Sequence, residues 1–449
     1  MEELHSNLDE FIRILREQSE NFTDCRTGKN TQYEISDAVM SAFSIFFMQS
    51  PSFLYGQQKL QKFRNKNNLQ SLFRTINIPG DTQIRKILDG INPNETFPFF
   101  GDVISYLEKK KYLDLFRGYN DNLLIAVDGT SYHSSDTISC KKCSRRTHKN
   151  GKTTYLHSVI APAIVRPGMK KNQVLVIEPE FIEPQDGNDK QDCEQTAFKR
   201  WLDSYGSKYA AKKATILGDD LFCNEPICKL LLEHKLDFIL TCKESSHKNL
   251  FKEEITFLAE NDKIDEIQVR NWTGKKGEIS IYRWANALPI RSVSKESPEP
   301  LSVNWCELTI LDENSFDEKF YNSYVTNFSI NPENVADIIR DGRSRWSVEN
   351  GSYNILKNHG YHGEHNFGHG QNHLSSFLFT LNLIAFLIHT VSDLTDHAYQ
   401  ETRSSCINYY DFFIHVQLLS NMFPINSWSN LFSLIIMGEK EGLPLSISY

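Results

Sequence analysis

The chain has 449 residues, of which 40% are hydrophobic and 12% aromatic, a composition typical of well-packed globular proteins. At about 150 residues per domain it has room for roughly two to four domains, and it is neither collagenous nor wholly disordered. Its net charge of −8 does not indicate a nucleic-acid-binding protein as a whole. However, residues 141–171 contain nine Lys or Arg residues and no acid, so a basic patch is compatible with the acidic total.

The N-terminal residues are polar with an amphipathic helical pattern, so no secretory signal peptide is predicted. Nine cysteines without such a signal indicate reduced thiols in the cytoplasm. The longest apolar stretch, residues 374–390, is nearly as long as a membrane span. Because Ser375, Ser376, Thr380 and Asn382 interrupt it, we predict a buried core helix and no membrane partner.

Residues 1–118 are predicted to be helical. In "PGDTQIRKILDGI", Pro79 and Gly80 end one element, and Ile84, Ile87 and Leu88 fall on one face of the next helix. Short helices separated by tight turns are compatible with a helix-turn-helix DNA-binding domain. They are equally compatible with a helical cap that makes no contact with DNA.

From residue 121 the pattern changes to β-rich runs, "LLIAVDG", "TTYLHSVIAPAIV" and "NQVLVIEPEFI". A helix, the strand "ATILGDD", a second helix and the strand "DFILTCK" follow. This β-β-β-α-β-α-β order is that of the ribonuclease-H-like fold, so we predict an α/β (α+β) protein with a mixed five-stranded sheet flanked by helices. The predicted regions are an N-terminal helical domain (1–118), the core (119–249), a β-rich insertion (250–325), the rest of the core (326–395) and a helical tail (396–449).

Two acids follow buried strands at equivalent places: Asp128 after "LLIAV" and Asp219 after "ATILG". In a ribonuclease-H-like sheet these strands are neighbours, so the carboxylates converge and repel each other unless a cation binds between them. Oxygen ligands of this kind suit Mg²⁺ or Mn²⁺. Asp220 competes with Asp219 for this place, and the strand-end register favours Asp219.

A third acid, Glu349, lies on the helix predicted after the insertion. Arg345, four residues earlier, and Lys357, eight residues later, are expected near the same helical face. A carboxylate between cations suits a metal bridged to phosphate. The alternative is an ordinary i, i+4 ion pair, which is worth only about 0.2–0.5 kcal/mol.

The segments "IAVDGT", "ILGDD" and "RWSVENGSYNILKNHGYHGEHNFGHG" resemble a DDE transposase of a bacterial insertion sequence, of the cut-and-paste group with a β insertion before the catalytic Glu. The resemblance covers roughly residues 30–395. It implies that Asp128, Asp219 and Glu349 hold two Mg²⁺ or Mn²⁺ ions and that Arg345 and Lys357 bind DNA phosphates. It further implies cleavage and strand transfer on double-stranded DNA, namely the element's terminal inverted repeats and target DNA. A homodimer would hold both ends, in the cytoplasm at the nucleoid.

The match departs from the family pattern at two positions. The family Tyr three residues before the Arg is Gly342 here, and the family Lys seven residues after the Glu is Leu356, followed by Lys357. Two alternative functions stay open: a nuclease of the same fold without strand transfer, and an inactive transposase-derived DNA-binding protein.

The basic run begins with Lys141, Lys142, Arg145 and Arg146. Contacts between these cations and DNA phosphates would give sequence-independent, salt-sensitive affinity. The alternative is a solvated loop.

A CxxC motif, Cys140 and Cys143, precedes His148 and His157, and Cys140, Cys143 and His148 are the candidate ligands of a structural Zn²⁺. The spacing matches no common zinc finger, and the alternative is a pair of reduced thiols beside a basic loop. Five further histidines lie between residues 359 and 373 in a Gly-rich segment. We predict that this segment is a loop after the Glu349 helix, with a metal role as the weaker alternative.

Overall fold

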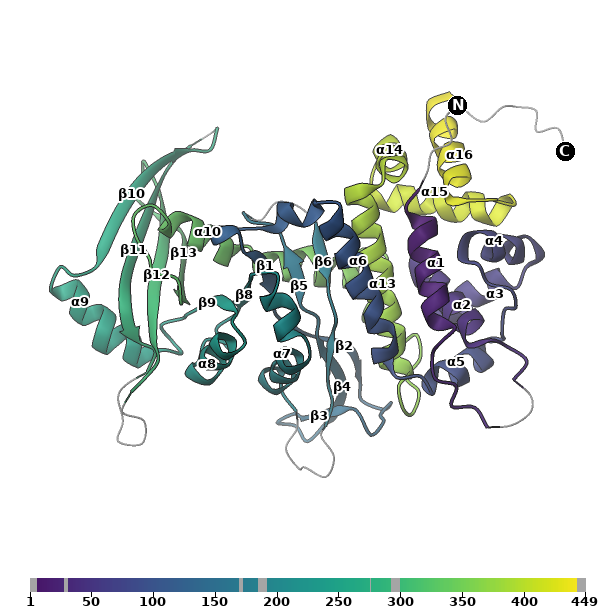
Figure 1. The fold of residues 1–449 in the computed structure, drawn as a ribbon, viewed down its shortest axis with the longest axis horizontal. Helices are drawn as coiled ribbons and strands as arrows, with labels where there is room; N and C mark the ends of the chain where they lie inside the picture. The colour runs from purple at the N-terminus through teal and green to yellow at the C-terminus, as the bar shows by residue number, and fades with distance from the viewer. Residues whose placement is uncertain are drawn as a thin grey trace.

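The computed structural model describes residues 6–27, 31–168, 173–184, 192–274, 276–291 and 299–441. Three regions follow one another along the long axis of the molecule (Figure 1). Long strands of the insertion lie at one end, the core sheet with its helices lies in the middle, and the N-terminal and C-terminal helices lie together at the other end. The carboxyl ends of the core strands carry the predicted aspartates.

The core contains five strands in the order β6-β5-β1-β8-β9. Strand β1 runs parallel to β8 and antiparallel to β5, and β8 runs parallel to β9. Helices α7 (Glu194–Ala210) and α8 (Glu225–Glu233) precede and follow β8. This arrangement is the predicted mixed sheet of the ribonuclease-H-like fold. The strands are β1 (Leu123–Ala126), β5 (Ala163–Val165), β6 (Val174–Val176), β8 (Ala214–Gly218) and β9 (Asp237–Thr241).

The insertion extends this sheet. Strand β13 pairs antiparallel with β9, with Tyr324 opposite Thr241, and a meander continues outward as β12, β11 and β10. The result is one nine-stranded sheet in which the insertion and the core share a hydrogen-bond ladder. The inserted elements are η4 (Leu250–Ile255), α9 (Thr256–Glu260), β10 (Asp265–Trp272), β11 (Gly277–Pro289), β12 (Ser302–Asp312) and β13 (Glu318–Thr326).

A second sheet, which the sequence did not predict, begins beside the first. Its order is β2-β4-β3, and β7 pairs with residues 158–160 of β4 on the side opposite β2, beyond the end of β3. The run predicted as one strand over residues 153–165 divides at Pro162, and the next run divides at Pro179. Proline has no N–H for a ladder, so each run leaves one sheet and joins the other there. The strands are β2 (Gly129–Ser135), β3 (Ser144–Thr147), β4 (Thr153–Ile160) and β7 (Glu180–Ile182).

The apolar stretch forms helix α13 (Leu374–Thr395), which packs against α2, α5 and β6. Among the described residues it is the one helix long and apolar enough to cross a membrane, but 94% of its apolar window is buried inside the fold. The prediction of a core helix is therefore confirmed. Among the described residues up to 118 the elements are helical, as predicted, and η3 leads into the core: α1 (Leu8–Ser19), α2 (Ile35–Phe47), α3 (Phe53–Leu60), α4 (Phe63–Phe73), α5 (Asp81–Asp89), η1 (Pro93–Thr96), α6 (Phe97–Lys109), η2 (Tyr112–Phe116) and η3 (Tyr119–Asp121).

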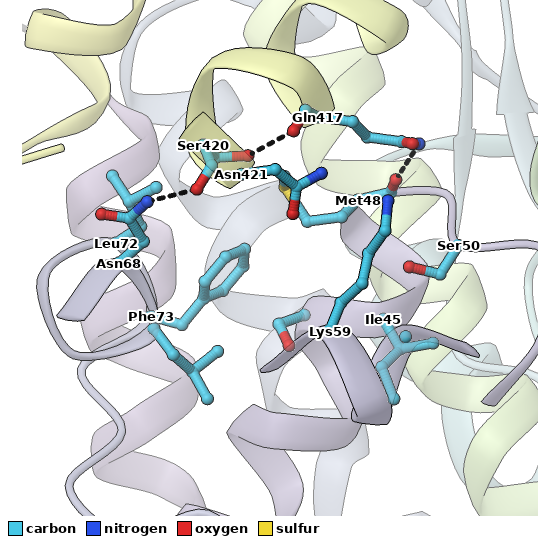
Figure 2. Close-up of a pocket in the computed structure, with 13 residues that line it drawn as sticks. Ile45, Met48, Ser50, Lys59, Asn68, Leu72, Phe73, Gln417, Ser420 and Asn421 are labelled. Atoms are coloured by element: carbon cyan, nitrogen blue, oxygen red, sulfur yellow. Dashed lines mark hydrogen bonds between the residues drawn. The ribbon is translucent and has the colours of Figure 1, made fainter. Parts of the chain in front are cut away.

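The C-terminal helices pack on the N-terminal ones. The Gln417 side chain donates to the Met48 carbonyl at 2.7 Å, and the Asn68 side chain donates to the Ser420 carbonyl at 2.5 Å. Figure 2 shows the pocket that these residues line between α2, α4 and α15. The tail therefore completes a helical bundle at the end of the molecule away from the insertion (Figure 1). Its helices are α14 (His397–Ser405), α15 (Tyr409–Met422) and α16 (Trp428–Glu441).

Candidate active site

The register of the two central strands brings Asp128 and Asp219 side by side. Ala126 on β1 pairs with Leu217 on β8, and the two strands are parallel. Each aspartate lies two residues beyond this pair, so both have the same place along the sheet. Adjacent strands lie about 4.8 Å apart, and residues two positions apart share a face. The two carboxylates therefore leave the sheet next to each other, as the sequence predicted.

Glu349 reaches the same place from a helical segment. The segment consists of α10 (Val335–Arg343), α11 (Trp346–Val348), the π-helical turn η5 (Glu349–Tyr353) and α12 (Asn354–Asn358). Nη1 of Arg345 lies 2.9 Å from Oε1 of Glu349 and 3.5 Å from Oδ2 of Asp128. One guanidinium thus bridges two of the three acids.

The Arg345 guanidinium offsets only part of the cost of burying a negative charge at Asp128. Burial raises the pKa of Asp128 to about 7, and Arg345 opposes this rise. The negative charges of Glu349 and Asp219 raise the pKa further, so both lie close enough to repel it. A carboxyl in this state binds a proton or a cation readily.

The donor set fits a hard divalent cation, because it consists of carboxylates alone. Among the described residues, however, the three acids do not form a group whose ligand atoms all lie within 4.8 Å of one another. The Arg345 guanidinium stands between Asp128 and Glu349. Closing the acids around a metal would require this side chain to move.

Asp220 is engaged on the other side of β8. Its Oδ1 accepts a hydrogen bond from the Lys243 backbone N–H at 2.7 Å and lies 3.3 Å from Nε2 of His247. Asp219 accepts from the N–H of Leu221 at 2.9 Å, which supports the turn after the strand. The register and these contacts favour Asp219 as the acid that faces Asp128.

Tyr353 anchors the Glu349 segment to the strand ends, a role that the sequence analysis missed. Its buried hydroxyl donates to the backbone carbonyl of Asp128 at 2.6 Å and accepts from the Ala161 N–H at 3.3 Å. Tyr353 lies four residues after Glu349, so helical spacing was a signal that could have identified it.

Glu194 is a fourth acid at this edge, and the sequence analysis missed it too. Burial raises its pKa, and the charge of Asp219 raises it further. Its side chain lies against the start of β2, where a Cβ on Gly129 would approach Oε1 of Glu194 to 2.3 Å. No local pattern indicates this position, because it depends on how α7 packs against the strand ends.

The Lys357 side chain forms its ion pair with Glu364 and not with any of the three acids. Its Nζ lies 2.8 Å from Oε1 of Glu364, in the loop that follows the helix. The π-helical turn after Glu349 accommodates one residue more than an α-helical turn. Lys357, eight residues after Glu349, therefore has about the rotational position that the seventh residue would have in a regular helix. This accounts for the shift of the Lys relative to the family pattern.

Gly342 also departs from the family pattern for a structural reason. Helix α10 packs directly on β9 and β13 at this point, and a Cβ on Gly342 would lie 2.9 Å from atoms of Ile239 and Tyr324. Contacts this short do not accommodate a larger side chain without displacing the helix.

The predicted phosphate-binding cations lie on the second sheet. Lys141, Arg145 and Arg146 are exposed at or next to β3, whereas Lys142 is half-buried and pairs with Glu183 at 3.0 Å. The sheet begins directly after Asp128 and extends to β3, at the lower edge of Figure 1. Lys170 and Lys171, the end of the basic run, lie outside the described residues.

Of the two histidines that follow the CxxC motif, His157 lies with the cysteines and His148 does not. Cys140, Cys143, His157 and His369 form one group, whereas His148 is exposed and hydrogen-bonds Thr154 at 2.9 Å. The predicted ligand His148 was therefore wrong. In the β3–β4 hairpin Ser144 pairs with Leu156, which places His157 opposite Cys143 and His148 in the turn.

Comparison with known families agrees with this geometry. The chain matches the family described as transposase DDE domain over residues 120–387, that is 268 of 449 residues. It therefore belongs to the DDE transposase family. Members of this family act on DNA, generally use divalent metal ions and are typically cytoplasmic. A search of curated proteins found no match to the chain.

Proposed function

We propose that this transposase binds the terminal inverted repeats of its own insertion sequence, cleaves the DNA there and transfers the freed 3′ end to target DNA. The observation that carries the proposal is the equivalent register of Asp128 and Asp219 on adjacent parallel strands. The contacts of Arg345 with Glu349 and Asp128 add the third acid to the same edge.

Asp128, Asp219 and Glu349 would hold two Mg²⁺ or Mn²⁺ ions. Such a pair, when bound, activates an attacking oxygen and stabilises the leaving oxygen of a phosphodiester. Arg345 would then give up its place between two carboxylates and donate to a DNA phosphate, for which its planar fork of N–H groups is suited. Tyr353 would hold the backbone of Asp128 in place through this change.

The DNA would extend along the second sheet, where Lys141, Arg145 and Arg146 contact phosphates without sequence preference. Lys357 would contribute at the edge of the same path after release from Glu364. The helical region up to residue 118 would recognise the repeats, and a homodimer would hold two ends together at the nucleoid. The tail after residue 395 is a candidate for the dimer contact.

The test uses labelled duplexes that carry the repeats flanking the coding region, incubated with protein and Mg²⁺ or Mn²⁺. Cuts at the repeat boundary with new 3′-hydroxyls are expected. Asp219→Asn should lower the cleavage rate by at least about 100-fold, since even the loss of an outer-shell partner of a metal ligand costs 10–100-fold. Asp220→Asn is the matched control and should leave most of the activity, because its amide oxygen can still accept from Lys243.

Capture of joined products with target DNA separates the proposal from its alternatives. Cleavage without joining, with paired ends supplied, would indicate a nuclease of the same fold. Binding without cleavage under both metals would indicate a DNA-binding protein derived from a transposase. Equal loss in the Asp219 and Asp220 variants would contradict the assignment of Asp219.

A further inference from the structure

Four potential metal ligands meet where the second sheet touches the loop between α12 and α13. Cys140 and Cys143 precede β3, His157 lies on β4, and His369 comes from the His-rich loop. Cys143 and His157 are buried. One ligand atom of each residue, a cysteine sulfur or a histidine ring nitrogen, lies within 4.8 Å of those of the other three.

Four of the six separations among these atoms match the edges of a tetrahedron around zinc. Zn–S bonds of about 2.3 Å and Zn–N bonds of about 2.05 Å imply edges of about 3.8 Å between two sulfurs and about 3.6 Å between sulfur and nitrogen. The sulfurs of Cys140 and Cys143 are 3.8 Å apart. His157 Nε2 lies 3.4 Å from each sulfur, and His369 Nε2 lies 3.6 Å from the sulfur of Cys143.

Neither a disulfide nor ordinary core packing accounts for this cluster. A disulfide requires sulfurs about 2.05 Å apart, and both cysteines are free. Nε2 of His157 lies 3.4 Å from both sulfurs, and a single ring nitrogen cannot form two well-aligned hydrogen bonds at once. Two further groups in the described part of the chain, around Cys223 and Cys406, offer only three ligands each. The four-ligand group alone fits a closed structural site.

We propose that Cys140, Cys143, His157 and His369 bind one structural Zn²⁺. The metal joins segments that are 226 residues apart in sequence, Cys143 and His369. It fastens the second sheet to the loop that leaves the Glu349 segment. Since β3 begins directly after Cys143, the metal also fixes the strand that carries Arg145 and Arg146. The site does not depend on the proposed DNA chemistry.

Hydrogen bonds to Asp89 also fix the end of the His-rich loop that carries His369. The Asp89 carboxylate accepts hydrogen bonds from four consecutive backbone N–H groups of residues 371–374 at 3.0 to 3.2 Å. These bonds hold the loop to helix α5. Zinc would hold the same loop to the second sheet through His369. Removal of the metal should therefore free His369 from the second sheet, while residues 371–374 stay bonded to Asp89 at the end of α5.

The test measures metal content without DNA. Protein expressed in zinc-supplemented medium and washed with a mild chelator should contain one zinc per chain by elemental analysis. Cys143→Ser and His369→Asn should each lower this to less than about a fifth. The exposed residues His148 and Cys193 provide matched controls, and His148→Asn and Cys193→Ser should keep full occupancy.

X-ray absorption of the wild-type protein tests the site even if the variants fold poorly. It should report two sulfurs at about 2.3 Å and two nitrogens at about 2.05 Å from zinc. The absence of zinc in the purified wild-type protein would overturn the proposal. So would a shell of oxygen ligands, or loss of zinc in His148→Asn. None of these results would bear on cleavage by the three acids.

Discussion

Asp128→Asn should stabilise the metal-free protein, and the effect should grow with pH. Burial raises the pKa of Asp128 from its ordinary value of 3.8 to about 7, so the folded chain binds this proton more tightly than the unfolded chain does. Below pH 3.8 both states are protonated and the residue has no effect. Between pH 3.8 and about 7 only the unfolded state is ionised, so wild-type stability falls as pH rises.

The magnitude follows from the same pKa difference of about 3.2. At 1.36 kcal/mol for each pKa unit, the wild type loses at most about 4 kcal/mol above pH 7. The neutral Asn avoids this loss and can still accept the hydrogen bond from the Gly129 N–H. The advantage of the variant should therefore increase by about 3 kcal/mol between pH 5 and pH 8.

Urea unfolding in EDTA at several pH values measures this advantage. Asp136→Asn is the control, because the pKa of this exposed acid is lowered by its hydrogen bonds with Lys152 and Thr154. Its neutralisation should give no gain at pH 8. With saturating Mg²⁺ the wild type should regain stability and the Asp128 variant should not. An Asp128 variant less stable than wild type at pH 8 in EDTA, or an advantage independent of pH, would refute the reasoning.

Two further substitutions test contacts that hold the fold together, one beside the site and one in the N-terminal helices. Tyr353→Phe leaves the Asp128 carbonyl without its hydrogen bond, so unfolding in urea should show a loss of about 1–3 kcal/mol, together with slower cleavage of the ends. Unchanged stability and cleavage would contradict this role. Asp37→Ala removes the buried partner of Arg16, which keeps only the exposed Glu20, and it also leaves the N–H groups of Ile76 and Asn77 without their acceptor. It should destabilise by about 3–5 kcal/mol in the same assay. Asp81→Ala, which removes a half-exposed i, i+4 pair, should cost no more than about 1 kcal/mol, and equal losses in both variants would contradict the argument.

Local patterns identified most of the core. The apolar run before Asp128 and the one before Asp219 are buried strands, and their order with the intervening helices defined the ribonuclease-H-like fold. The spacing of Ile84, Ile87 and Leu88 gave the buried face of α5. These features depend on neighbours in sequence, because strand and helix periodicity is set by the backbone itself.

Other features depended on contacts between distant segments. The two prolines that divide the strand runs were visible, but the sheet that each half would join was not. The partner of Cys143 at residue 369 follows only from the approach of the His-rich loop to β4. Glu194 reaches Asp219 because α7 packs over the strand ends.

The sequence by itself determined the class of fold, the two strand-end aspartates and the existence of a third acid on a following helix. Only the tertiary structure decided that Arg345 bridges two of those acids, that Lys357 pairs with Glu364, and that the insertion continues the core sheet. The physical reason is that hydrophobic periodicity and strand ends are local properties of the chain. Packing of the elements fixes the rest: it brings Arg345 to Asp128, 217 residues away, and it sets the course of the loop that carries Glu364.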